Sequence, residues 1–136
     1  MTETKVRAGA LIVEDNKLLL VNGKGRKEFW TPGGKIEENE TEEDCLKREL
    51  EEELRVQLVS YKFYKEYLRK SFYHDYMLKN KMYLVSIKGK PKSNSEIAQL
   101  HWLSKKEFEE HRLSIVPVIN EEVIPDLIKD KILCNQ

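Results

Sequence analysis

The pattern of hydrophobic positions predicts β-strands in the first quarter of the chain and again in its middle. Two β-favouring runs, Val6–Val13 and Lys17–Val21, are separated by Glu14-Asp15-Asn16, a typical turn sequence. We therefore expect these two runs to form a β-hairpin. Later apolar runs predict strands over Val56–Leu68 and Asp75–Ile87 and a short one over Leu100–Leu103.

A helical period appears between these two groups of strands. Leu46, Leu50 and Leu54 recur at intervals of four residues, which places them on one face of a helix. Thr41 is a favourable N-cap residue, and the acids at 42–44 complement the positive end of the helix dipole. We predict a helix that begins after Thr41 and packs through its leucines.

The last third of the chain predicts two more helices. Ser104 is expected to cap a helix that extends to about His111. Pro117 suits the start of a last helix, in which Pro125 is expected to cause a kink. The order of strands and helices predicts an α+β sandwich with a mixed β-sheet and flanking helices.

Composition fits one domain over residues 1–136, with 40% hydrophobic and 35% charged residues. No run approaches the roughly 18 apolar residues that a transmembrane helix needs. The first seven residues lack the apolar core of a signal peptide. Cys45 and Cys134 have neither metal-ligand nor disulfide spacing, and Cys45 is expected to be a small buried residue. We therefore expect a cytoplasmic protein without membrane contact.

The formal net charge is zero, but the charges are unevenly distributed. Residues 37–53 hold ten acids against two bases, whereas residues 57–92 hold nine lysines and arginines against two acids. An acidic metal site beside a basic surface would suit a metal-bound polyphosphate. Two solvated charged faces are the simpler interpretation of the individual residues.

Three of the acids have a spacing that indicates chemistry. Glu49, Glu52 and Glu53 stand at positions i, i+3 and i+4 of the predicted helix, so their side chains share a face. Like charges this close repel each other and destabilise the helix unless a cation lies among them. A hard divalent ion with a preference for oxygen ligands would offset the repulsion, which indicates Mg²⁺, or Mn²⁺ in its place.

The same residues belong to a longer motif that resembles the Nudix box. Gly34, Glu40, Arg48-Glu49-Leu50, Glu52-Glu53 and Val56 match the pattern Gly-x5-Glu-x7-Arg-Glu-U-x-Glu-Glu-x-Gly-U, in which U is aliphatic. The one departure is Arg55, which replaces the last glycine. That glycine would stand where the helix ends, often in a left-handed conformation, so Arg55 is expected to strain a turn without removing a ligand.

The resemblance implies a Nudix α/β/α sandwich and hydrolysis of a phosphoanhydride bond in a nucleoside diphosphate derivative. It implies that Glu52 and Glu53 are principal metal ligands and that the Gly34 carbonyl assists them. Glu49 is either a ligand or the base that activates water, and Glu96 is a second candidate for base or metal contact. The choice between Glu49 and Glu96 as general base stays open.

Arg48 cannot bind a metal, but its fork of N–H donors can orient a carboxylate through a bidentate pair. We expect Glu40 to have a structural role. Lys24, Arg26 and Lys35 are candidates for phosphate contacts, and Arg7 is expected to line the pocket.

Substrate choice lies outside the motif. The resemblance to bacterial MutT-type enzymes indicates a nucleoside triphosphate or an oxidised dNTP, cleaved to a nucleoside monophosphate and pyrophosphate. It makes Asn120 a candidate base contact, with a helix-surface or capping role as the alternative. Tyr73 lies where dinucleoside polyphosphate hydrolases carry a tyrosine. Aromatic side chains that could stack on a base are Phe72, Tyr73, Tyr76 and Tyr83.

Other functions are alternatives to this one. They are hydrolysis of dinucleoside polyphosphates, ADP-ribose or nucleotide sugars, and non-catalytic nucleotide binding by a regulatory Nudix-like domain. The retained carboxylates favour an enzyme. A nucleic-acid partner is not expected, since no RNA-binding motif accompanies the basic segment. A homodimer is possible.

Overall fold

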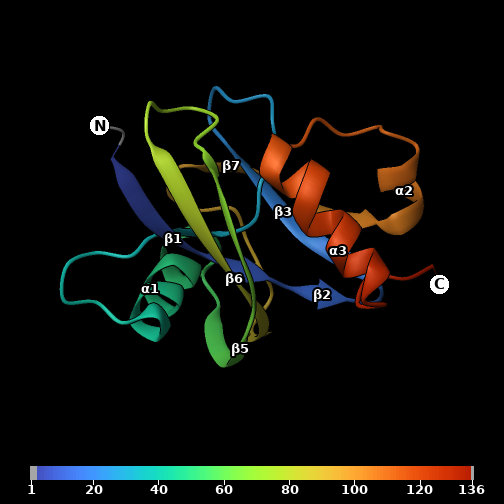
Figure 1. Cartoon of the computed structure of the whole chain (residues 1–136). Helices are drawn as coiled ribbons and strands as arrows, with labels where there is room; N and C mark the ends of the chain where they lie inside the picture. The colour runs from blue at the N-terminus through green and yellow to red at the C-terminus, as the bar shows by residue number, and fades with distance from the viewer. Residues whose placement is uncertain (1–2, 136) are drawn as a thin grey trace.

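The computed structural model describes residues 3–135, which form two β-sheets flanked by helices (Figure 1). The first sheet has the strand order β4-β1-β6-β5, and the second has the order β2-β3-β7. The strands are β1 (Thr4–Leu11), β2 (Val13–Glu14), β3 (Lys17–Gly23), β4 (Gly33–Lys35), β5 (Gln57–Lys70), β6 (Met77–Lys88) and β7 (Ile97–Ser104). The helices are α1 (Glu42–Leu54), α2 (Lys105–Glu109), the π-helical turn η1 (Ile119–Val123) and α3 (Ile124–Lys129).

Helices cover opposite sides of the sheets because successive strand residues face opposite ways. Alternate residues of β1 and β3 pack with the leucine stripe of α1 in one core cluster. The residues between them pack with η1 and α3 in a second cluster. The first sheet is mixed, since β1 runs parallel to β6 and antiparallel to β4. The expected α+β sandwich with a mixed sheet and flanking helices is therefore confirmed.

The predicted hairpin between the first two runs is wrong over most of its length. Strand β1 is already paired on both edges, with β4 and β6, so it has no free edge for β3. The chain leaves the first sheet at Ile12, and only the two residues of β2 pair with β3. The main partner of β3 is β7, which extends beyond the short segment that was expected there.

Helix α1 begins and ends as predicted. The Thr41 side chain accepts a hydrogen bond from the Asp44 N–H at 3.1 Å, and Cys45 is fully buried beside the leucine stripe. Arg55 follows the helix in the left-handed region, with φ 59° and ψ 37°. Ser104 caps α2 in the same way as Thr41 caps α1, through the Glu107 N–H.

The last helical segment begins at Pro117, as expected, but it is not a simple kinked α-helix. It takes the π-helical form over η1 and then continues as α3. Pro125 stands at the start of α3, directly after the π-helical turn. Across residues 3–135, no helix is both long and apolar enough to cross a bilayer.

Candidate active site

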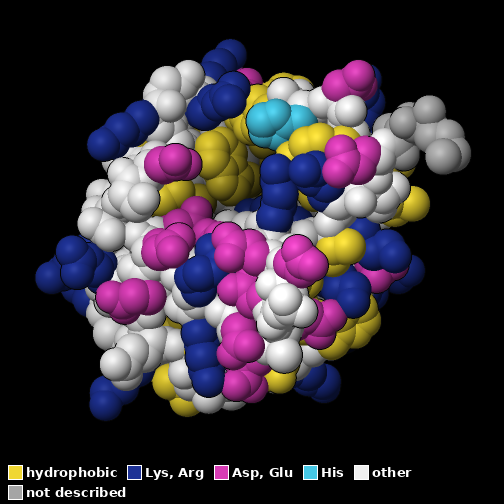
Figure 2. Space-filling model, turned by 90° about the vertical axis from the view of Figure 1, so that its left-hand side faces the viewer, with side chains coloured by type: hydrophobic (Ala, Val, Ile, Leu, Met, Phe, Trp, Pro, Cys, Tyr) yellow, Lys and Arg dark blue, Asp and Glu magenta, His cyan; other side chains and the backbone are white. Residues whose placement is uncertain are grey.

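A cavity of about 1210 Å³ opens beside α1. Its walls come from β1, β4 and β6, from the loop Ser71–Tyr76 between β5 and β6, and from Val116–Ile119 before and at the start of η1. Figure 2 shows a hollow with hydrophobic side chains at its floor, Lys and Arg side chains around its rim, and a band of Asp and Glu side chains below it. The cavity therefore joins an acidic surface to an apolar interior.

Two glycines allow the carboxylates of α1 to lie against β4. A side chain at Gly34 would overlap the Glu49 carboxylate. Gly33 has φ 138°, in the region that favours glycine, and a Cβ there would overlap the Ala8 carbonyl. The Gly33 N–H donates to Glu53 Oε1 at 2.9 Å. The turn before the helix thus positions both Glu49 and Glu53.

Arg48 connects Glu40 and Glu49 through hydrogen bonds from its guanidinium group. Its Nε and Nη2 donate to the two carboxylate oxygens of Glu40 at 2.7 and 3.0 Å, and its Nη1 donates to Glu49 Oε1 at 2.7 Å. These hydrogen bonds from Arg48 lower the pKa of Glu40 to about 2. The expected bidentate pair is present, with Glu40 as the partner, and the same guanidinium also orients Glu49.

The surroundings of the Glu49 and Glu53 carboxyls disfavour a negative charge. Burial raises the pKa of Glu53 to about 7, although the Gly33 N–H and the nearby Arg7 guanidinium oppose the shift. Burial also raises the pKa of Glu49, against the hydrogen bond from Arg48. A bound cation would offset both the desolvation and the mutual repulsion of these groups.

The candidate donors are the carboxylates of Glu49 and Glu53 and the Gly34 carbonyl. All of them are oxygen atoms, which suits a hard divalent cation. Glu52 has a different position from its two neighbours. Its side chain is 54% exposed and lies 3.7 Å from Arg48 Nη1. Within residues 3–135, no three Asp, Glu, His or Cys side chains are already clustered closely enough to hold a metal ion.

Most of the residues expected from the sequence lie around the cavity. Its lining includes Arg7, Lys24, Arg26, Gly34, Lys35, Glu49, Glu53, Tyr73 and Glu96. The lining does not include Arg48, Glu52 or Asn120. Arg48 contacts the site through its hydrogen bond to Glu49 Oε1. Asn120 directly follows Ile119, the last residue of η1 that lines the cavity.

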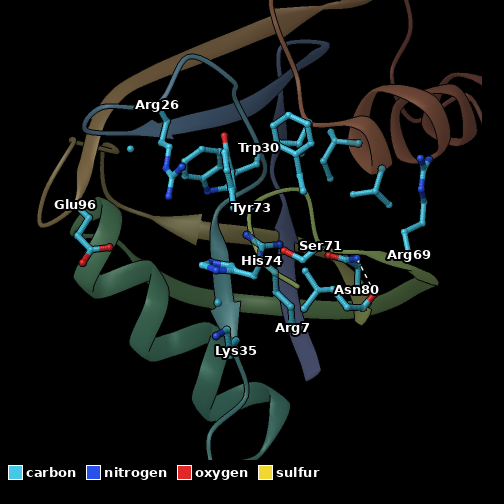
Figure 3. Close-up of a pocket in the computed structure, with 18 of the residues that line it drawn as sticks. Arg7, Arg26, Trp30, Lys35, Arg69, Ser71, Tyr73, His74, Asn80 and Glu96 are labelled. Carbon is cyan, nitrogen blue, oxygen red and sulfur yellow. Dashed lines mark hydrogen bonds between the residues drawn. The ribbon is translucent and has the colours of Figure 1, made fainter. Parts of the chain in front are cut away.

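An aromatic wall stands above the floor of the cavity (Figure 3). Trp30 and Tyr73 meet edge to face with ring centroids 5.8 Å apart, and the Arg26 guanidinium lies 4.1 Å from the Tyr73 ring centroid. The Tyr73 hydroxyl donates to Glu28 at 3.0 Å. Tyr83, also considered for base stacking, is only 2% exposed and belongs to the core cluster under α1.

Asn80 and Arg69 also line the cavity, although no motif or spacing in the sequence indicates them. They reach the cavity through the register of the strands, which a single sequence does not show. Arg7 pairs with Lys35 on one side and with Asn80 on the other, so these three side chains belong to one row on the same face of the sheet.

Comparison with known proteins identifies the family. A family model described as the NUDIX domain matches residues 3–127. The chain belongs to the NUDIX family. Accordingly it is a Nudix pyrophosphohydrolase, from a family that acts on nucleotide derivatives and generally uses divalent metal ions.

Solved structures with the same fold include several Nudix proteins. A MutT NUDIX hydrolase from Burkholderia pseudomallei is 26% identical, with 74% of this chain and 83% of that chain covered and a TM-score of 0.67. A NUDIX hydrolase from Nitrosomonas europaea is 19% identical over 98% of each chain, with a TM-score of 0.78. A MutT protein from Methanosarcina mazei Go1 is 15% identical, with 96% of this chain and 97% of that chain covered and a TM-score of 0.80. Comparison with curated protein sequences gives no match.

Proposed function

We propose that this Nudix enzyme hydrolyses a nucleoside triphosphate or an oxidised dNTP to a nucleoside monophosphate and pyrophosphate, with Mg²⁺ as its cofactor and Mn²⁺ as a substitute. The observation that carries the proposal is the pair of half-buried carboxyls, Glu49 and Glu53, at one end of a cavity with basic and aromatic walls. Anionic phosphates suit the basic side chains, and a metal ion suits the acids.

We assign Glu49, Glu53 and the Gly34 carbonyl to the metal. Glu52 shares their helix face and would join them by rotating its exposed side chain away from Arg48. The bound ion would neutralise phosphate charge and lower the pKa of a coordinated water. Glu96 would provide a further contact from the loop before β7, which also contacts the end of α1 through the Asn94 N–H and the Glu53 carbonyl.

The remaining residues bind the substrate and position the reacting groups. Lys35 and Arg7 would bind phosphate oxygens from neighbouring strands, while Arg48 holds Glu49 in place. Either Glu49 or Glu96 would accept the proton of the attacking water. The water oxygen forms a bond to phosphorus as the bridging P–O bond breaks, and pyrophosphate and the monophosphate separate.

A substrate panel tests the proposal. It contains the common NTPs, oxidised dNTPs, ADP-ribose, nucleotide sugars and dinucleoside polyphosphates, each assayed with Mg²⁺ and with Mn²⁺. We expect the highest kcat/KM for a triphosphate, with monophosphate and pyrophosphate as products. Equal and negligible turnover of every substrate by the wild type and by Glu53→Gln would contradict an enzymatic role. A cytoplasmic location and a homodimer stay predictions, and light scattering would check the second.

A further inference from the structure

Asn80 lies at the floor of the cavity with its side-chain amide held in one orientation. The residue is 3% exposed, and its Nδ2 donates to the Tyr67 carbonyl at 3.3 Å and to the Leu78 carbonyl at 3.2 Å. Both partners are carbonyl oxygens, which only accept hydrogen bonds. The amide nitrogen must therefore face them, and Oδ1 is the atom left over.

This remaining oxygen opens into the cavity. Within residues 3–135, no donor forms a hydrogen bond to Asn80 Oδ1. The oxygen is also not one of the fully enclosed side-chain atoms that lack a partner, and Asn80 is a lining residue. A largely buried acceptor without a donor is unfavourable, so the site is suited to a ligand that supplies an N–H.

The strand register places Asn80 away from the acidic end of the cavity. Glu49 packs against Gly34 on β4, Arg7 stands on the next strand, β1, and Asn80 stands on the strand after that, β6. Two strand spacings amount to about 10 Å. Figure 3 shows the same order, with Glu96 on one side of the cavity and Asn80 near Arg69 on the other.

The surroundings of Asn80 suit a flat aromatic group. Trp30 and Tyr73 stand across the cavity from it in Figure 3, and Leu78 and Val116–Ile119 add apolar lining. Apolar and aromatic walls hold a planar ring through contacts with its two faces. A fixed polar atom then selects the ring by the hydrogen-bonding group on the ring's edge.

We propose that the nucleobase of the substrate occupies this end of the cavity and that Asn80 Oδ1 accepts a hydrogen bond from an amino group on the base. The inference deepens the proposed function and rests on it for the orientation of the nucleotide. Asn80 becomes a specificity-determining residue, because two facing acceptors repel and a base carbonyl at the same position is disfavoured. Adenine is then preferred to hypoxanthine, and cytosine to uracil.

Asn120 provides the matched comparison. The family resemblance made it a candidate base contact, yet the cavity lining ends at Ile119. An Asn-to-Leu substitution changes the same atoms at both positions. The preference for an amino-bearing base should be lost in Asn80→Leu and retained in Asn120→Leu.

The experiment measures binding and turnover separately for ATP, ITP, CTP and UTP. Binding is measured by calorimetry with Ca²⁺ in place of Mg²⁺, and hydrolysis is measured with Mg²⁺, in the wild type, Asn80→Leu, Asn80→Ser and Asn120→Leu. Asn80→Ser is a second variant in case the leucine disturbs the sheet, and thermal melts verify that each variant folds. We expect the wild type to bind the amino-bearing member of at least one pair about tenfold more tightly. That ratio should fall to near one in both Asn80 variants.

The outcomes separate this inference from the proposed function. The assignment of Asn80 would be overturned if the wild type bound ATP and ITP equally and CTP and UTP equally, or bound none of them. It would also be overturned if folded Asn80→Leu kept the preference for the amino-bearing base. Loss of the ratio in Asn120→Leu alone would assign base recognition to the other asparagine and overturn it as well. Selective binding that depends on Asn80, without hydrolysis of any nucleotide, would support the inference and contradict the proposed function.

Discussion

At the scale of single residues, the position of the Glu49 carboxylate explains why residue 34 is a glycine. Gly34→Ala adds a methyl group where the Glu49 carboxylate lies, so we expect the carboxylate to be displaced. The hydrolysis rate should fall by roughly tenfold or more, because small misplacements of reacting groups are costly. Steady-state kinetics with the preferred nucleotide measures the effect. Gly89→Ala, at φ 110° in ordinary contact with Val56, should lower stability without lowering kcat. Equal kcat in wild type and Gly34→Ala would contradict this explanation.

Arg55 is the second residue whose conformation has a measurable consequence. Its φ of 59° is in the left-handed region, which glycine adopts without the steric cost of a Cβ atom. Arg55→Gly should therefore raise the free energy of unfolding by about 0.5–1 kcal/mol, since part of the gain is offset by the flexibility of unfolded glycine. Urea denaturation measures the change. Arg55→Ala keeps the Cβ atom and should give no such gain; equal stabilisation by both variants would show that the backbone is not strained.

At the scale of elements, polar contacts attach α3 to strand β5. The Tyr67 hydroxyl donates to Asp126 at 2.7 Å, and Lys65 lies 3.1 Å from Asp130. Tyr67 is 7% exposed, whereas Lys65 and Asp130 are more exposed, so the tyrosine contact should contribute more to stability. Tyr67→Phe is expected to cost about 1 kcal/mol of unfolding free energy in urea denaturation. Tyr64→Phe removes an exposed hydrogen bond to Asp130 and should cost less; the reverse order would contradict the assignment.

The same tyrosine predicts a pH dependence. Burial, together with the hydrogen bond to Asp126, raises the pKa of Tyr67. Because the folded state holds this proton more tightly, an unfolded tyrosine ionises first, near its ordinary pKa of about 10. The stability that protonated Tyr67 contributes is present below that pH and is lost as the pH rises above it. Thermal melts from pH 8 to 11 should show a steeper loss in the wild type than in Tyr67→Phe. Parallel curves would rule out a contribution from Tyr67.

Elements with local signals were predictable from the sequence. Helix α1 has its N-cap, its leucine stripe and its end within a continuous stretch, so its bounds and buried face were correct. Strand pairing has no comparable local signal. The hairpin prediction failed because β1 pairs with β6, more than sixty residues later, and the three-residue β4 is too short to show a pattern.

At the scale of the whole molecule, the candidate site was predictable where the motif supplies it. The motif residues Gly34, Glu49 and Glu53 come together because the turn and α1 are neighbours in the chain. Asn80 and Arg69 reach the cavity only through the register of the first sheet. The acidic half of the cavity was therefore visible in the sequence, whereas in the half proposed to select the base only aromatic candidates such as Tyr73 were visible and Asn80 was not.

We propose that the carboxylates of α1 hold the divalent ion that hydrolysis requires. The most direct test is a Mg²⁺ titration of the hydrolysis rate in the wild type, in Glu53→Gln and in Glu51→Gln. Glu51 lies on the same helix, is exposed and does not line the cavity, so it controls for the loss of one charge. We predict a Mg²⁺-dependent rate that is retained in Glu51→Gln and falls roughly a hundredfold in Glu53→Gln, a change of about 2.7 kcal/mol. A rate unaffected by Mg²⁺ removal, or equal in Glu53→Gln and the wild type, would contradict the claim.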